Sequence, residues 1–238
     1  MARALQQFGA ASSRLFFACE QPGSNRALAT LPSPETDQGV PLLWAPGTAA
    51  DASNMQRLAT AIQARTAAGS PVTVGARGRS SVAHALRALA RATRAGRHTV
   101  EFRAEWTAEG TGFALRFKAV RGADYAEFHE SACETGADRS LMVAKTTQVA
   151  PLARAIASEL RNFCRCELKT MADFSEAGEV RTSTLAKAIA SAHRYLKANQ
   201  LPRCVAVQMP RDSLTVHVWT AVTEQTKELE RGASDMET

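Results

Sequence analysis

The chain has 238 residues, with 29 Lys and Arg against 23 Asp and Glu, and a sequence pI near 9.4. A hydrophobic fraction of 45% excludes a wholly disordered chain, and no apolar run of about 18 residues exists, so we expect no membrane span and no membrane partner. Aromatic residues make up 6%, which excludes stacking on exposed rings as the main mode of nucleic-acid recognition.

Residues 1–34 have the composition of a targeting segment. They contain Arg3, Arg14 and Arg26, several Ser and Ala, and Glu20 as their single acidic residue. This pattern predicts a flexible basic transit peptide for an organelle, with the mitochondrion as the expected destination. The alternative is a disordered basic tail on a cytoplasmic protein.

Residues 40–121 are expected to form a first βαβαββ unit. Apolar residues alternate where strands are expected and recur every three or four positions where helices are expected. Gly69 and Gly96 end the two helices, and the turn 108–110 joins the last two strands into a hairpin. The expected strands lie at 40–45, 72–74, 100–104 and 113–117, and the expected helices lie within 51–69 and 80–96.

The same order of patterns returns in residues 139–222. A longer loop, 171–181, separates the second strand from the second helix of this unit, and Pro202 marks a break before the hairpin. The sequence therefore predicts an α+β fold with two tandem βαβαββ domains, a linker over 122–138 and a charged tail over 223–238. The expected strands lie at 141–143, 164–168, 204–208 and 214–218, and the helices lie within 149–163 and 182–196.

The stretch from Ala52 to Val100 contains eight arginines and no lysine or acidic residue. Such a stretch repels itself unless solvent or a polyanion neutralises it, and arginine makes forked contacts with phosphate oxygens. Free N–H groups at the start of the second helix also attract phosphate. The sequence therefore predicts a phosphate-binding site, with a solvated helix face as the alternative. The residues are Arg77 and Arg79 in the loop before this helix and Arg87, Arg91 and Arg94 at i, i+4, i+7 along it.

The junction Val74-Gly-Ala-Arg-Gly-Arg-Ser-Ser-Val-Ala-His-Ala-Leu86 resembles the end of the second strand and the start of the second helix in the Alba family. The second unit resembles the SpoVS sporulation proteins, which are relatives of Alba. The matching stretches there are Met142-Val-Ala-Lys-Thr-Thr-Gln-Val-Ala-Pro-Leu-Ala153 and Thr184-Leu-Ala-Lys-Ala-Ile189. The resemblance covers most of residues 40–222.

This resemblance implies Alba-like units that bind RNA, DNA or both and are commonly dimeric. In the family, basic residues after the first strand, at the start of the second helix and on the hairpin approach the phosphate backbone. By position, Arg77 and Arg79 match the second of these groups in the first unit. Lys145 matches the first group in the second unit, and Arg181 lies just before the second helix of that unit.

Both units depart from the family pattern. The first unit has no basic residue after its first strand, and its hairpin contains Glu105 and Glu109 in place of an arginine-rich arm. The second unit has Arg211 alone in its hairpin turn, and its 171–181 loop contains three acidic residues. Neither unit keeps the complete basic set, so the resemblance does not imply that both units bind nucleic acid.

Further candidates are weaker. Lys145 can contact a phosphate at the start of a helix, or it can be an exposed side chain beside a capped helix. Lys187 and Arg194, at i, i+7, form a second basic face or a solvated one. Tryptophans are expected to pack in the core or between domains rather than to stack on bases; they are Trp44, Trp106 and Trp219.

The sequence contains no motif for catalysis, a cofactor or a metal, and its five cysteines lack disulfide spacing and favour a reducing compartment. We therefore expect a non-enzymatic RNA-binding protein that needs no cofactor or metal, with DNA as the alternative ligand. A second hypothesis is a structural subunit of a large ribonucleoprotein, such as a mitochondrial ribosome. A third is that degenerate Alba-like units serve only for dimerisation. The partner assemblies that we consider besides RNA are a homo- or hetero-oligomer and a ribonucleoprotein particle.

Overall fold

The computed structural model describes residues 40–47, 52–109, 112–128, 140–197, 200–210 and 212–220. The basic segment 1–34, residues 129–138 of the expected linker and the tail 223–238 lie outside these ranges. So does Arg211, the basic residue of the second hairpin turn. All described residues belong to one compact unit.

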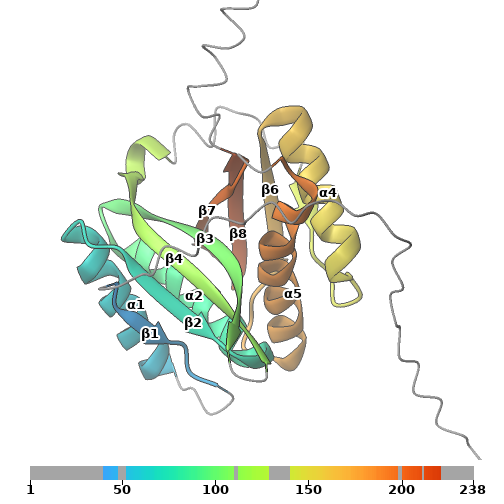
Figure 1. Cartoon of the computed structure of the whole chain (residues 1–238). Helices are drawn as coiled ribbons and strands as arrows, with labels where there is room; N and C mark the ends of the chain where they lie inside the picture. Colours follow the sequence, from blue (N-terminus) through green and yellow to red (C-terminus); the bar gives the residue numbers. More distant parts are fainter. Residues whose placement is uncertain are drawn as a thin grey trace, which may run out of the picture. The chain divides into compact units, whose positions relative to one another are not determined.

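Each half of the described chain has the order βαβαββ, and the α+β class is confirmed (Figure 1). The first half consists of β1 (Leu42–Trp44), α1 (Ala52–Ala67), β2 (Val72–Ala76), α2 (Gly78–Ala95), β3 (His98–Glu109) and β4 (Gly112–Asp124). The second half consists of β5 (Ser140–Met142), α4 (Val149–Phe163), β6 (Arg165–Met171), α5 (Glu176–Ala192), the 3₁₀ helix η1 (His193–Tyr195), β7 (Pro202–Met209) and β8 (Ser213–Thr220).

The strands of both halves form one mixed, eight-stranded sheet in the order β1-β2-β4-β3-β7-β8-β6-β5. The β1–β2 and β5–β6 pairs are parallel and the other pairs are antiparallel. The order of the second half mirrors that of the first, and the halves meet where β3 pairs with β7, at Glu101–Val205 and Phe102–Cys204. The two expected domains therefore share one sheet. That each half folds as a domain of its own, joined to the other by a linker, stays a prediction.

The halves also exchange helix contacts. Helix α2 packs against β7 of the second half, α5 packs against β3 of the first half, and the two helices pack against each other. Every side chain from Ser80 to Ala90 is buried as a result. The many alanines of α2 suit this position, because small side chains let a helix approach its neighbours closely.

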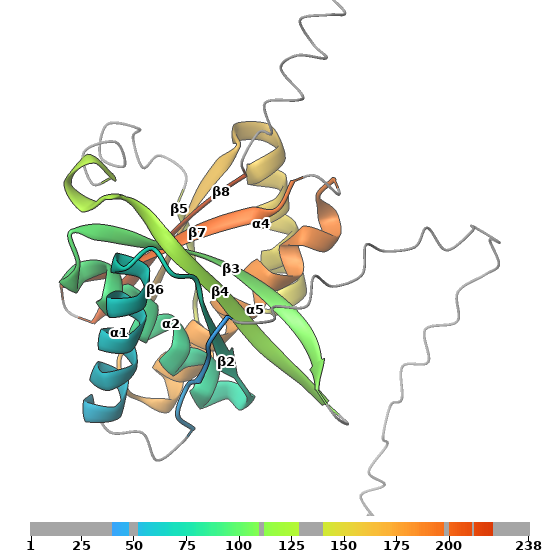
Figure 2. The same ribbon diagram turned by 60° about the vertical axis from the view of Figure 1, so that its left-hand side comes forward.

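The helices cover one face of the sheet over a single hydrophobic core that spans both halves (Figures 1 and 2). Cross-strand partners lie on the same face of a sheet, so the pairs Phe102–Cys204 and Cys204–Val218 continue this core through the junction of the halves. Phe102 and Phe117 add an edge-to-face contact with ring centroids 5.8 Å apart. Each fully buried large side chain contributes roughly 1.5–3 kcal/mol.

Helix α5 begins at Glu176, earlier than the cap at Thr182 or Ser183 that the sequence predicts. Ser175 is its cap, and the Ser175 hydroxyl accepts a hydrogen bond from the Gly178 backbone N–H at 3.1 Å. Gly178 lies within the loop that the sequence predicts, yet it is helical here. Glycine is required at this position because a Cβ would collide with Asp173. The 171–181 loop therefore ends at residue 175.

The first hairpin is longer than expected, because β3 runs to Glu109 and β4 continues through Asp124 into the segment assigned to the linker. Figure 2 shows its two strands as a long paired ribbon. Helix α2 begins at Gly78, whose φ of +78° suits glycine. The hydroxyl of Ser81 accepts a hydrogen bond from the Arg77 N–H at 3.2 Å and donates one to the Ala45 carbonyl at 2.9 Å, which ties the start of α2 to the end of β1.

Candidate nucleic-acid interface

The arginine-rich helix α2 meets acidic residues from the other half of the chain. The Ser80 hydroxyl donates to Glu179 Oε2 at 2.6 Å, and His84 Nε2 lies 3.8 Å from Glu179 Oε1. Arg79 Nη1 lies 3.5 Å from Glu176 Oε1. Helix α2 has no acidic residue in its own first turn, so Glu179 supplies the negative charge that the helix dipole favours there.

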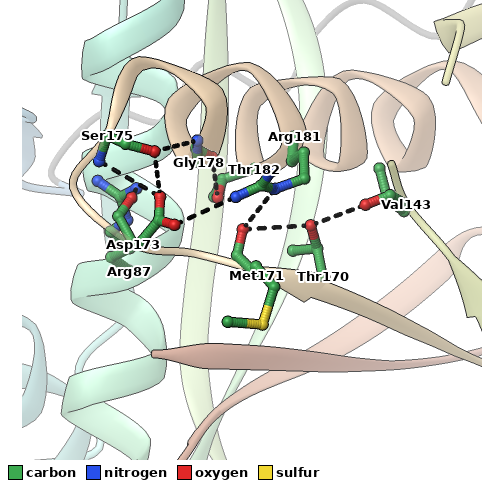
Figure 3. A network of polar contacts seen from close by, with 9 residues as sticks. All are labelled: Arg87, Val143, Thr170, Met171, Asp173, Ser175, Gly178, Arg181 and Thr182. Atoms are coloured by element: carbon green, nitrogen blue, oxygen red, sulfur yellow. Dashed lines mark hydrogen bonds and ion pairs between the residues drawn. The ribbon is translucent and has the colours of Figure 1, made fainter. Parts of the chain in front are cut away.

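Arg87 is 5% exposed and lies buried where α2 meets the second half of the chain, not on an exposed face of the helix. One of its terminal nitrogens, Nη2, donates to the Asp173 carbonyl (Figure 3). Its guanidinium lies 4.9 Å from the centroid of the Phe174 ring. Desolvation lowers the pKa of Arg87, against the opposing charges of Glu179 and Asp173. Arg87 therefore adds no exposed cation to the row of arginines on α2, because the second half covers this turn of the helix.

The other two positions of the stripe differ from each other. Arg91 is half-buried, with its guanidinium 5.9 Å from the Phe174 ring centroid. Arg94 is exposed in the last turn of α2, where a cation also suits the helix dipole. The i, i+4, i+7 row therefore runs from the interior to the surface and does not form one continuous basic face.

Arg181 braces the loop before α5 (Figure 3). Its Nη2 lies 3.3 Å from Asp173 Oδ2, and its Nε donates to the Met171 carbonyl at 3.1 Å. The Ser175 hydroxyl and N–H both donate to Asp173 Oδ1, and these hydrogen bonds, assisted by Arg181 and Arg87, hold the pKa of Asp173 below its ordinary value against the effect of burial. The Arg181 side chain is 18% exposed, and its hydrogen-bonding groups contact the protein's own loop.

Arg77 remains on the surface, with 60% of its side chain exposed. Its Nη2 binds Glu109 Oε2 at 2.7 Å, and Arg116 binds the other oxygen of the same carboxylate at 2.8 Å. The hydrogen bond from Arg116, followed by that from Arg77, holds the pKa of Glu109 below its ordinary value, against desolvation. Glu109 stands where the resemblance leads one to expect an arginine-rich hairpin, and its carboxylate binds two arginines, Arg77 and Arg116.

Trp44 lies beside this cluster and is 47% exposed, whereas the sequence predicts packing in the core or between domains. The Arg77 guanidinium lies 5.5 Å from the indole centroid. The ring rests on Gly75, since a Cβ there would come within 3.0 Å of two indole carbons. In contrast, Trp106 is half-buried, packs against the core and donates to the Ser191 hydroxyl at 3.3 Å, and Trp219 is half-buried.

Two lysines of the second half have different surroundings. Lys145 is exposed in the β5–α4 connection, beside a turn in which the Ala144 N–H donates to the Thr147 hydroxyl at 2.9 Å. Lys187 is half-buried on α5, and burial, followed by the positive charge of Arg79, lowers its pKa. The fold thus brings Arg79 and Lys187 near each other from opposite halves, which the sequence spacing does not reveal.

Among the described residues, no three side chains of His, Cys, Asp or Glu gather as a metal-binding group. No helix in the described ranges combines the length and apolar character needed to cross a membrane. Searches against protein-family models and against curated proteins find no match for this chain.

Proposed function

We propose that this chain is a non-catalytic RNA-binding protein that contacts the phosphate backbone at the loop between β2 and α2. The observation that supports this most is the exposure of Arg77 and Arg79, whose side chains are 60% and 54% exposed while the next three turns of α2 are buried. They lie at the start of a helix, where free N–H groups and the dipole add to the attraction for phosphate.

The ion pair of Arg79 does not prevent phosphate binding. Glu176 is 86% exposed and lies 3.5 Å from Arg79, and exposed pairs of this kind contribute only about 0–1 kcal/mol. A phosphate that forms forked hydrogen bonds with an arginine can therefore replace the carboxylate. Lys187 adds a second positive charge near Arg79, and we include it in the site.

The charge of the whole described fold also favours a polyanion. The described residues contain twice as many Lys and Arg as Asp and Glu. Helices α1 and α2 contain no acidic residue, and the two acidic residues of α5 already face Arg79 and His84. Exposed Arg94 and Lys145, with half-buried Arg91, extend the positive surface, whereas we assign Arg87 and Arg181 to the fold.

RNA is the favoured ligand over DNA. The central helices α2 and α5 are largely buried between the sheet and each other, so neither is free to enter a major groove and read base edges. Contacts to phosphate and shape suit structured RNA. The transit-like composition of residues 1–34 leads us to propose that the protein acts in the mitochondrion, with the cytoplasm as the alternative.

The mirrored strand order and the βαβαββ order of each half support Alba-like units as the origin of the fold. The resemblance of residues 74–86 and 142–153 to that family agrees with this proposal. In such a tandem, the two units of one chain would pair with each other in the way that two copies of a single unit form a dimer.

The test is binding of a structured RNA and of duplex DNA to the full chain over a range of salt concentrations. Replacement of Arg77 and Arg79 by Ala should weaken RNA binding and make the slope of log K against log [salt] shallower by about 1.4–1.8, the value for two lost phosphate contacts. The matched control is Arg154→Ala with Arg161→Ala, two exposed arginines of α4. An equal loss of binding in this control would refute the proposed site. Absence of RNA binding by the unaltered protein would refute the proposed function.

A structural subunit of a ribonucleoprotein, such as a mitochondrial ribosome, is the second candidate. It is favoured by large apolar side chains that are exposed on the two edge strands and near the hairpin tip: Leu42 and Trp44 on β1, Met142 on β5 and Phe113 on β4. Edge strands with exposed apolar residues tend to pair with other chains. Sedimentation of the native protein with a heavy particle, together with weak binding to isolated RNA, would favour this candidate.

A further inference from the structure

We propose that Trp44 is a stacking platform for one unpaired base of a single-stranded RNA segment, next to the phosphate site at Arg77. This inference rests on the proposed RNA-binding function and extends it, because it assigns to the same site a preference for unpaired nucleotides. Base stacking on a single ring supplements phosphate binding here and does not replace it.

The geometry of β1 and β2 makes one face of the indole available. Trp44 pairs in register with Gly75, and the ring lies against this glycine on the side of the sheet that faces away from the helices. A Cβ at position 75 would lie 3.0 Å from Cε3 and Cζ3, so any larger residue there would force the ring outward by a few tenths of an ångström. The glycine therefore supports the inner face of the indole, and almost half of the side chain stays exposed.

Basic side chains surround this platform on the same face. Arg116 is the cross-strand partner of Gly75, and Arg77 lies over the indole at 5.5 Å. Both bind the single carboxylate of Glu109, so the cluster keeps a net positive charge beside the ring. An aromatic face with adjacent arginines is the combination by which proteins hold single-stranded nucleic acid, in which bases stack and phosphates pair with the cations.

A base in the interior of a duplex does not fit this arrangement, because both of its faces are covered by its neighbours. An unpaired base can leave its stack and lie on the outer face of the indole in place of the Arg77 guanidinium, which then turns to contact the phosphate. The proposed occupant is therefore a single-stranded segment, such as the loop or the end of a structured RNA.

The experiment compares the full-length protein with Trp44→Leu on three probes: a single-stranded oligouridylate, a blunt RNA duplex of equal charge, and heparin, a polyanion without bases. We expect Trp44→Leu to weaken oligouridylate binding by about 5- to 150-fold, the range for loss of one stacked base, with an unchanged salt slope. Binding to the duplex and to heparin should stay the same, and Trp44→Phe should retain most of the affinity.

A second variant tests the charge arrangement without altering the ring. Glu109→Gln removes the carboxylate that Arg77 and Arg116 share, so it should strengthen oligouridylate binding several-fold and steepen the salt slope. Unchanged binding of oligouridylate by both variants, while the unaltered protein still binds RNA, would overturn the stacking proposal and leave the proposed function intact. An equal loss on all three probes in Trp44→Leu would also overturn it, since a general surface or folding effect would then explain the loss. Failure of the unaltered protein to bind any RNA would refute the proposed function itself.

Discussion

The burial of Arg87 makes a prediction that separates a structural role from a ligand-binding one. In Arg87→Ala, the protein loses two buried methylene groups, at about 0.8 kcal/mol each. It also loses a hydrogen bond from a charged donor to the Asp173 carbonyl, about 1.5–3 kcal/mol, and the contact with the Phe174 ring, about 0.5–1 kcal/mol.

One effect opposes this loss. The Nε and Nη1 atoms of Arg87 are buried without a hydrogen-bond partner, so removal of the side chain relieves a desolvation cost of about 1–3 kcal/mol. The net expectation for Arg87→Ala is destabilisation by about 1–4 kcal/mol. Arg87→Met keeps most of the apolar stem and removes the unpartnered groups, so it should cost less than Arg87→Ala.

Urea unfolding of the full chain, followed by circular dichroism, measures both changes as a shift of the midpoint at constant slope. Arg94→Ala is the matched control, because it removes the same side chain from an exposed position of the same helix, and its effect should stay within about 0.5 kcal/mol. If Arg87→Ala were as stable as the control and instead lost affinity for RNA, Arg87 would be a ligand contact and the reasoning from burial would be refuted.

Three further predictions concern other groups of the fold. Hydrogen bonds from Arg116 and Ser175 hold the pKa values of Glu109 and Asp173 below their ordinary values. The stability that these two carboxylates contribute is therefore complete above about pH 4.5 and is lost as the pH falls through their pKa values in the folded protein. The thermal midpoint should fall as the pH is lowered below about 4.5, and it should fall less in Asp173→Asn. Burial raises the pKa of Cys166 to about 12, so peptide mapping after iodoacetamide treatment at pH 8 should find exposed Cys164 modified and Cys166 unmodified until the protein is unfolded. Gly178→Ala places a methyl group into Asp173 and should lower the thermal midpoint by several degrees, and an unchanged midpoint would contradict the tight contact.

Local patterns predicted the elements of this fold well. Alternation and helical spacing located the hairpins and helices of both halves, because each residue's neighbours in sequence determine these patterns. Helix α5 was the main exception. Gly178 and the acidic residues around it are typical of a loop, yet Ser175 caps a helix there and the glycine makes room for Asp173, a contact that only the folded chain reveals.

The candidate site was harder to predict, because its members come from distant parts of the chain. Arg77 was expected at the surface and lies there, but its contacts with Trp44 and Glu109 depend on the pairing of β1 with β2 and of β3 with β4. The exposed position of Trp44 had one available signal, the glycine at position 75 in the expected second strand, which lies opposite Trp44 in the parallel β1–β2 pair. A glycine in a strand often marks a close approach, here that of an indole.

The arginine-rich stretch illustrates how a charge pattern can have two origins. Its lack of acidic residues suggests an external polyanion, but part of the compensation comes from Glu176 and Glu179 in the other half of the chain. The acidic 171–181 segment, a departure from the Alba pattern, is therefore the complement of the arginines of α2. The charge of Lys187 is more informative for function, because Glu176 pairs with Arg79, whereas the pKa of Lys187 is lowered by burial and by the like charge of Arg79. A phosphate between such groups would relieve their repulsion, and we therefore expect anion binding there rather than along the buried helix.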